Sequence, residues 1–212
     1  MTAEDKKVWN FDEYDWVEQY DERMRGMKRL CYEETLRHLL KCVEVKPDDF
    51  VLDIGTGTGN SALPFLERGC RVAGLDPSLR MLKQAEEKVS QWAGRFSIQR
   101  IDEPFLSIPF DDRTFDLVVS AYAIHHLDDH AKQKAVGEMK RVLKPCGQIA
   151  IADTMFRDAA HKANALAMYP DLEDEYHPLL TNFPSMFEAE GFGIALHQIG
   201  ELVWILVAPR KR

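Results

Sequence analysis

The sequence predicts a doubly wound α/β fold, in which helices cover both faces of a largely parallel sheet. From residue 50 onward, short apolar runs alternate with stretches of helical periodicity. The apolar runs are hydrophobic throughout, as expected of parallel strands that are buried on both faces. A turn with three glycines, "GTGTG" at 55–59, joins the first apolar run to the first helical stretch.

Five strands and three helices are expected between residues 50 and 153. The strands are "FVLDI" (50–54), "RVAGL" (71–75), "FSIQRI" (96–101), "FDLVVS" (115–120) and "QIAIAD" (148–153). The helices between and after them are expected at 59–68, 78–92 and 129–143. A further helix is expected before the sheet at 28–43, where apolar residues recur at helical spacing.

The last third of the chain departs from this alternation. Residues 158–178 are rich in alanine, histidine and acids. Two strand-like runs then follow closely, "GIALHQI" (193–199) and "ELVWILVA" (201–208). Runs so close together suggest a hairpin that closes one edge of the sheet.

Composition excludes several function classes. The chain has 212 residues, 45% of them hydrophobic, and a formal net charge of −8. Apart from a short "RKR" tail, Lys and Arg are interspersed with acids, so a nucleic-acid backbone is not expected as a partner. No run is long and apolar enough for a membrane span, and the N-terminus lacks a signal core, so a soluble, cytoplasmic protein is expected. The four cysteines form no C-x-x-C pair, which indicates neither a zinc site of cysteines nor a disulfide framework.

The glycine turn is expected to bind a nucleotide or a nucleoside. Gly55 and Gly57 remove side chains at a strand-to-helix turn, so backbone amides can approach a ligand and φ can be positive. Asp76 follows the second strand, 21 residues after Gly55, where an acid can accept hydrogen bonds from two ribose hydroxyls. The turn and the acid together are stronger support than either alone.

Two ligand classes compete for this turn. Dinucleotide sites use G-x-G-x-x-G, whose third glycine would fall at Asn60, so an NAD-dependent oxidoreductase is disfavoured. Asp53 precedes the turn, and a carboxylate there suits a cationic ligand better than a pyrophosphate. A sulfonium that carries an α-amino group is such a ligand. Alternatively, Asp53 caps or orients the turn, because a buried acid needs a partner.

Four motifs resemble those of the class I S-adenosylmethionine-dependent methyltransferases: "LDIGTGTGN" (52–60), "GLDPS" (74–78), "PFDDRTFDLVVSAYAIHHL" (109–127) and "EMKRVLKPCGQIAIAD" (138–153). The "FDEYDWVEQYDE" opening also resembles the N-terminal segment of small-molecule methyltransferases. The likeness spans residues 11–153 and extends to small bacterial methyltransferases of the methyltransferase type 11 and ubiquinone-biosynthesis-like group. It implies a Rossmann-like sheet of seven strands, the last antiparallel, and S-adenosyl-L-methionine as the cofactor.

The resemblance also implies roles for individual residues. Asp53 and the glycines of the turn would serve the methionine end of the cofactor, Asp76 its ribose, and Tyr20 would cover the site. The implied cofactor-binding residues are Tyr20, Asp53, Gly55, Thr56, Gly57, Asp76, Pro77, Asp102 and Ala121. Asp102 is expected on the adenine side, with Glu103 or Pro104 as alternatives for the same position.

The stretch "HHLDDH" (125–130) has two interpretations. His126 and His130 are four residues apart, as two metal ligands on one helix face would be. We favour a helix start capped by Asp128 or Asp129, and therefore expect no metal site. His125 follows the fourth strand, where the methyl group should project. It is either a packing residue or the general base.

Other residues are also expected on the ligand side of the sheet. Tyr122 is the second candidate for a general base after His125. Asp153 and Thr154 end the fifth strand and either touch the acceptor or cap a loop. The stretch "YPDLEDEYHPLL" (169–180) is expected to be a solvated loop, with an acceptor lid as the alternative.

The hypothesis from the sequence is in-line methyl transfer from S-adenosylmethionine to a small-molecule acceptor. We expect one domain over residues 1–212, with an N-terminal helical cap (1–45), a cofactor-binding core (46–153) and an acceptor-side insertion with the hairpin (154–212). The alternative is a sensor or partner subunit that binds S-adenosylmethionine or S-adenosylhomocysteine without turnover. The sequence identifies neither the nucleophilic atom of the acceptor nor the oligomeric state.

Overall fold

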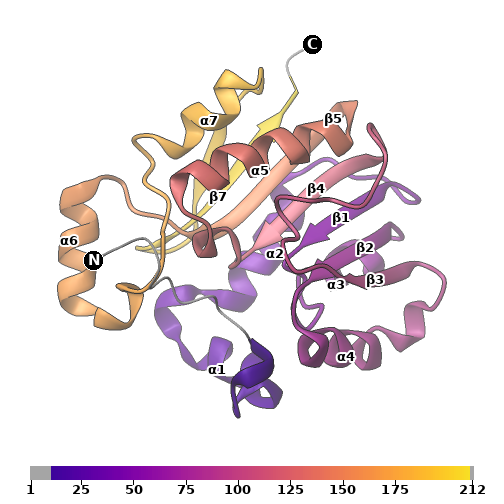
Figure 1. Cartoon of the computed structure of the whole chain (residues 1–212), viewed down its shortest axis with the longest axis horizontal. Coiled ribbons are helices and arrows are strands. Elements are labelled where there is room, and N and C mark those ends of the chain that lie inside the picture. The colour runs from indigo at the N-terminus through magenta and orange to yellow at the C-terminus, as the bar shows by residue number, and fades with distance from the viewer. Residues whose placement is uncertain (1–10, 211–212) are drawn as a thin grey trace.

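A seven-stranded sheet in the order β3-β2-β1-β4-β5-β7-β6 organises the chain in the computed structural model, which describes residues 11–210 (Figure 1). The N-terminal ten residues, where no signal core is expected, and the last two residues of the basic tail lie outside this range. The strands are β1 (Phe50–Ile54), β2 (Arg71–Asp76), β3 (Phe96–Arg100), β4 (Phe115–Ala121), β5 (Leu143–Thr154), β6 (Ala195–Gln198) and β7 (Val203–Pro209).

The doubly wound α/β fold predicted from the sequence is confirmed. Strands β1 to β5 pair in parallel, whereas β7 runs antiparallel to both β5 and β6. The two C-terminal runs form the expected hairpin, with β6 at the edge of the sheet. The parallel order reverses direction between β1 and β4, and in open α/β sheets ligands bind beside the carboxyl ends of strands at such a point.

Seven α-helices lie within residues 11–210. They are α1 (Tyr20–Gly26), α2 (Tyr32–Cys42), α3 (Leu63–Glu67), α4 (Leu79–Lys88), α5 (Asp129–Val142), α6 (Ala159–Met168) and α7 (Phe183–Ala189). The helix expected at 59–68 begins only at Leu63, because Gly59 has a φ of +81° that no right-handed helix allows. The helix expected at 28–43 is interrupted at Cys31, whose φ is +48°.

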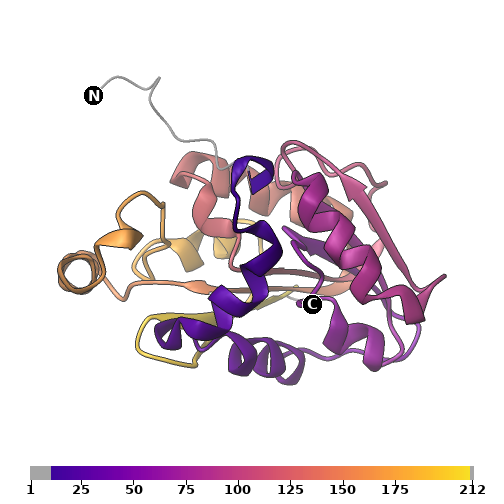
Figure 2. The ribbon, with the colours of Figure 1, turned by 90° about the horizontal axis from the view of Figure 1, so that it is seen from below.

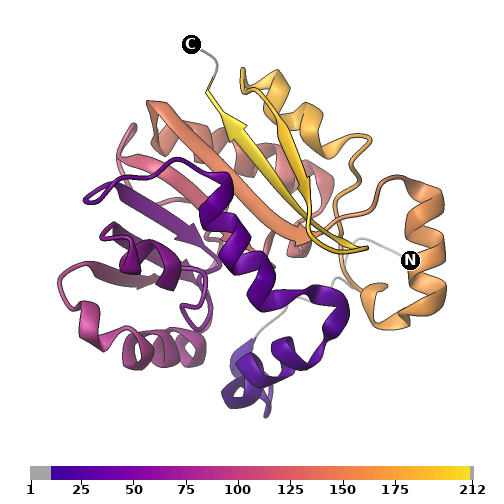
Figure 3. The same cartoon turned by 180° about the vertical axis from the view of Figure 1, so that it is seen from behind.

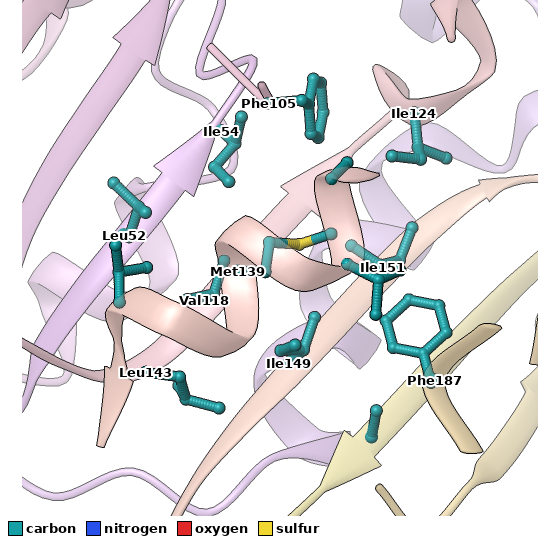
Figure 4. Close-up of a cluster of buried hydrophobic side chains, with 14 of the residues drawn as sticks. Leu52, Ile54, Phe105, Val118, Ile124, Met139, Leu143, Ile149, Ile151 and Phe187 are labelled. Atoms are coloured by element: carbon teal, nitrogen blue, oxygen red, sulfur yellow. The ribbon is translucent and has the colours of Figure 1, made fainter. Parts of the chain in front are cut away.

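The hydrophobic core has two layers, one on each face of the sheet. Leu52 and Ile54 of β1 point toward α5 and α7, where Met139 and Phe187 complete the cluster drawn in Figure 4. Val51 points to the opposite face, because successive residues of a strand alternate sides. There α2 and α3 cover the sheet, as the edge-on view of Figure 2 shows.

Two helical segments lie beyond the carboxyl ends of the parallel strands. Figures 1 and 3 show α1 and its neighbouring turns on one side of these ends and the α6 region on the other. These two segments, far apart in the sequence, therefore enclose the edge where a ligand is expected. Within residues 11–210, the helices are all too short or too polar to cross a lipid bilayer.

Candidate functional site

The glycine turn is held against the end of β2 by its own backbone. The amides of Gly55 and Thr56 both donate to the carbonyl of Leu75, at 2.8 and 3.0 Å. The amide of Gly57 donates to Oδ2 of Asp76 at 2.9 Å, and the amide of Ser78 donates to Oδ1 of the same carboxylate at 2.9 Å. Asp76 thus links the turn between β1 and α3 to the start of α4.

Gly55 is required by close packing as well as by backbone conformation. Its φ is +72°, and a Cβ at this position would lie 2.4 Å from the Cβ of Ala123, just beyond the end of β4. Gly57 has a φ of +52°, but the nearest atom to its ideal Cβ is the carbonyl oxygen of Gly55 at 4.0 Å. The backbone of Gly57 therefore faces open space beside the turn.

Asp53 lies behind the turn and is completely buried. Its Oδ2 accepts hydrogen bonds from Thr56 Oγ1 at 2.6 Å and from Ser61 Oγ at 2.7 Å. Its Oδ1 has no hydrogen-bond partner among residues 11–210. Burial raises the pKa of this carboxyl to about 6, although the two hydroxyl donors oppose the shift.

The first cavity opens beside the glycine turn and has a volume of about 370 Å³. The lining includes Asp76, whose pKa is raised to about 6 by burial against the opposing effect of its two amide donors. The predicted site residues that line it are Tyr20, Gly55, Gly57, Asp76, Pro77, Asp102 and Tyr122. Asp102, Glu103 and Pro104 all line it, so the structure does not separate the three adenine-side candidates.

Four predicted residues lie outside the lining of the first cavity. Asp53 is buried behind the turn, and Thr56 is nearly buried with its hydroxyl turned to Asp53. Ala121 is half-buried and packs against the hydrophobic clusters at the end of β4. His125 lines a different cavity, described below.

Polar contacts fasten the N-terminal segment over the first cavity. Asp12 accepts a hydrogen bond from Ser78 Oγ at 2.6 Å, and Asp21 accepts one from Thr58 Oγ1 at 2.6 Å. Lys88 Nζ lies 2.6 Å from the other oxygen of Asp21 and closes a network across the glycine turn. These contacts hold Tyr20 at the wall of the cavity.

The second cavity has a volume of about 240 Å³ and lies beyond a wall that it shares with the first. The shared residues are Phe11, Tyr20, Tyr122 and His126. Tyr122 has a φ of +53°, and its hydroxyl donates to the carbonyl of Leu30. Burial raises the pKa of this hydroxyl, so Tyr122 keeps its proton at neutral pH and is poorly suited to act as a general base.

His125 is buried between two carboxylates on the far side of this wall. Its Nδ1 lies 2.7 Å from Oδ1 of Asp153, and its Nε2 lies 3.7 Å from Oε1 of Glu175. Burial lowers the pKa of His125, but the charges of Asp153 and Glu175 outweigh that effect and raise it to about 9. His125 is therefore protonated on both ring nitrogens and positively charged at neutral pH in this arrangement.

Glu175 also faces a second buried imidazole. Its Oε2 lies 3.1 Å from Nε2 of His177, whose exposed fraction is 4%. The carboxylate lies off the direction of the ring N–H, so neither ring nitrogen of His177 has an aligned hydrogen bond within the described part of the chain. Burial raises the pKa of Glu175, but the charges of His125 and His177 more than offset it and lower the value to about 2.

The stretch 169–180 is not simply the solvated loop that was expected. Glu173 and Asp174 are exposed, but His177 is buried and Glu175 reaches the second cavity. The amide of Tyr176 donates to the carbonyl of His125 at 2.8 Å. The prediction was wrong for these residues because the contact partner lies about 50 residues away, beyond the range of sequence periodicity.

Lys132 explains how this stretch is held. Its side chain is fully buried on α5, and its Nζ donates to the carbonyls of Leu127 and Tyr176. Burial lowers the pKa of Lys132. A lone Lys in an amphipathic helix gives no signal in the sequence that it will be buried, so this residue was missed.

The "HHLDDH" stretch forms a helix start, as predicted. Asp128 caps α5, its side chain accepting a hydrogen bond from the amide of Ala131 at 2.8 Å. His125 and His126 belong to the preceding 3₁₀ turn η5 (Ile124–His126), whereas His130 is exposed on α5. The two histidines four residues apart are thus not on one helix.

Comparisons with known proteins agree with this architecture. A family model described as a methyltransferase domain matches residues 51–147. An uncharacterized methyltransferase of Geobacillus kaustophilus is 36% identical, over 92% of this chain and 94% of its own. The uncharacterized methyltransferase YrrT of Bacillus subtilis is 35% identical, over 93% of this chain and 95% of its own. A solved SAM-dependent methyltransferase from Aquifex aeolicus has the same fold, with a TM-score of 0.69 and 23% identity over 94% of this chain and 100% of that one.

Proposed function

We propose that this chain transfers a methyl group from S-adenosylmethionine to a small-molecule acceptor. The chain belongs to the class I S-adenosylmethionine-dependent methyltransferases. The cofactor of this family is S-adenosylmethionine. The observation that carries the proposal is the pair of adjoining cavities at the carboxyl ends of the parallel strands. One is bordered by the glycine turn and Asp76, and the other has room for a second small molecule.

The residues that line the first cavity, and Asp53 buried behind its glycine turn, fit the cofactor in two respects. Oδ1 of Asp53 is fully buried without a hydrogen-bond partner among residues 11–210, and a carboxylate oxygen left in this way favours a cationic ligand nearby. Gly57 lines the cavity with open space where a Cβ would stand. We assign Asp76 to the ribose, because this residue lines the same cavity and its carboxylate is fixed by two backbone amides.

The chemistry asks little of the protein beyond orientation. When bound, S-adenosylmethionine supplies an electrophilic methyl carbon, to which the acceptor's electron pair bonds as the carbon–sulfur bond breaks and S-adenosylhomocysteine leaves. The chain's contribution is to align the two ligands at the boundary between the cavities, which Tyr20 and Tyr122 both line. Orientation of this kind supplies up to about 7–11 kcal/mol in well-aligned systems.

His125 is our candidate for the group that stabilises negative charge on the acceptor. Asp153 holds its Nδ1, so Nε2 is the atom turned toward Glu175 and the second cavity. Because the charges around it raise its pKa to about 9, His125 at neutral pH is better suited to stabilise an anionic acceptor than to remove a proton. A role as general base requires its proton to be displaced first.

Calorimetry with S-adenosylmethionine and S-adenosylhomocysteine tests the cofactor half of the proposal. Transfer of a labelled methyl group to pools of small metabolites tests the other half. We expect binding of both ligands and transfer to a small molecule. Binding without transfer to any pool would favour the non-catalytic sensor, and a lack of binding would refute the site assignment.

Comparison of His125→Gln with the parent tests the residue assignment once an acceptor is known. The variant should bind S-adenosylhomocysteine within about threefold of the parent, because His125 does not line the first cavity. Its turnover should fall by roughly 10²-fold or more if the imidazole acts on the acceptor. Equal turnover in the two proteins would show that His125 has only a packing role.

A further inference from the structure

The side chains around His125 are arranged as the ligands of a metal ion are. A ring nitrogen of His125, a ring nitrogen of His126 and a carboxylate oxygen of Glu175 all lie within 4.8 Å of one another. Two ligands bound tetrahedrally at zinc distances of about 2.0–2.1 Å are about 3.3 Å apart. The 3.7 Å between His125 Nε2 and Glu175 Oε1 is close to that separation and too long for a hydrogen bond.

The partners of these residues resemble the outer shell of a metal site. Asp153 lies 2.7 Å from His125 Nδ1, which is a hydrogen-bond length and shorter than the separation of two ligands of one ion. The carboxylate of Asp153 also accepts the amides of His125 and Thr154. Asp153 therefore fixes the ring so that Nε2 faces inward, as carboxylates commonly do for metal-binding histidines.

His177 is the neighbour of Glu175 on the side away from His125 Nε2. It is buried, lines the second cavity and lies 3.1 Å from Oε2 of Glu175, off the direction of the ring N–H. This buried imidazole lacks an aligned hydrogen bond within residues 11–210, which is costly unless the cluster has a further partner. A cation bound to the other oxygen of Glu175 would fix this carboxylate between the ion and His177.

We infer that His125 Nε2, a ring nitrogen of His126 and the carboxylate of Glu175 form a binding site for one divalent transition-metal ion such as zinc. Two imidazoles and one carboxylate suit zinc-class ions rather than magnesium or calcium, which prefer oxygen ligands. This inference revises the expectation of no metal from the "HHLDDH" stretch. The ion takes the place of the proton on Nε2 and compensates the charges of Asp153 and Glu175.

The position of the site gives the ion a role in the reaction. His126 lines both cavities, whereas His125 and Glu175 line only the second, so the ion lies at the boundary on the acceptor side. Three protein ligands leave a fourth position open, as catalytic zinc sites do. This part rests on the proposed function: the open position takes an acceptor with a thiol or hydroxyl group, which binds the ion as its anion after its proton leaves to solvent.

Binding of Co²⁺ to tag-free protein, followed by its visible absorption and by calorimetry, tests the site directly. We expect one Co²⁺ per chain, displaced by Zn²⁺ and not by excess Mg²⁺. Glu175→Gln and His126→Gln should each weaken binding by at least about 100-fold, whereas Asp153→Asn should weaken it by about 10- to 100-fold. His130→Ala is the matched control, because His130 is exposed nearby and should leave Co²⁺ affinity unchanged.

Three results would overturn the inference. They are no saturable Co²⁺ binding by the parent, parent-like affinity in both Glu175→Gln and His126→Gln, or equal loss in His130→Ala. Circular dichroism of each variant shows whether it is folded, and the two ligand variants serve as independent tests. S-adenosylhomocysteine binding is measured on the same samples, so failure of the metal site and failure of the proposed cofactor site give different patterns.

Discussion

The two cavities share a wall, but the segments that line them are separated by different distances along the chain. The first depends on the glycine turn, Asp76 and the segment 102–106, which follow successive strands of one parallel sheet. The second joins the N-terminal segment, the end of β4, the end of β5 and the stretch 171–177. One side of the first cavity is therefore formed by local turns after neighbouring strands, whereas the second cavity depends on contacts between segments far apart in the sequence.

The largest expected effect comes from filling the close contact at the glycine turn. Gly55→Ala places a Cβ 2.4 Å from that of Ala123 at a φ of +72°, so both strain and overpacking act. We expect a loss of roughly 3 kcal/mol or more in the free energy of unfolding, measured in urea.

Gly94→Ala is the matched control for backbone strain. Gly94 has a φ of +87° but no atom within 4 Å of an added Cβ, so only about 1–2 kcal/mol of strain is expected. Equal losses in the two variants would mean that the contact between the turn and Ala123, just beyond the end of β4, adds nothing to the cost of the substitution.

The next effect separates the two cavities by ligand binding. Asp76→Asn removes the charge that we assign to the ribose, so S-adenosylhomocysteine should bind roughly 100-fold more weakly, or about 2.7 kcal/mol, by calorimetry. Co²⁺ binding should stay within about threefold of the parent, because Asp76 lines only the first cavity. Glu86→Gln, on the exposed face of α4, is the control. Unchanged S-adenosylhomocysteine affinity would show that the ribose is placed wrongly.

Removal of the buried amino group of Lys132 is expected to affect the second cavity and not the first. Lys132→Met leaves the carbonyls of Leu127 and Tyr176 without their donor, at an expected cost of about 2 kcal/mol in the free energy of unfolding. Amide hydrogen exchange should increase at residues 173–178 while S-adenosylhomocysteine affinity stays near that of the parent. Lys134→Met is the exposed control on the same helix. If exchange at 173–178 did not change, Lys132 would not hold this stretch.

The smallest effect expected is a pH dependence of the first cavity. Asp53 and Asp76 have pKa values raised to about 6 by burial, so their ionised forms are lost as pH falls through 6. An ionised carboxylate accepts hydrogen bonds from ribose or an ammonium group better than a protonated one. S-adenosylhomocysteine affinity should therefore fall roughly tenfold between pH 7.5 and 5, and less steeply in Asp76→Asn.

Stability should respond to pH with the opposite sign. A raised pKa in the folded state means that the native chain binds protons more readily than the unfolded chain between about pH 4 and 6. The contribution of Asp76 to the free energy of unfolding should therefore increase as pH falls through this window. The difference between parent and Asp76→Asn in urea unfolding at pH 5 and 7 measures it, and a difference that does not change with pH would mean that Asp76 is not perturbed.

Short-range patterns in the sequence determined the fold and the position of the glycine turn. Apolar strands, a glycine turn and an acid at the end of β2 occur at spacings set by the βαβ unit, so Gly55, Gly57 and Asp76 could be placed without coordinates. The helix start at Asp128 was readable for the same reason, because a cap acts within one turn.

Only the tertiary structure decided what faces His125. Glu175 and His177 come from a polar stretch whose local pattern is that of a solvated loop, and Asp153 comes from the neighbouring strand β5. No periodicity links segments about 50 residues apart that meet because Lys132 and the amide of Tyr176 bind backbone groups across the gap. Local spacing fixes backbone turns, whereas a cluster of ionisable side chains depends on which distant segments the packed core brings together.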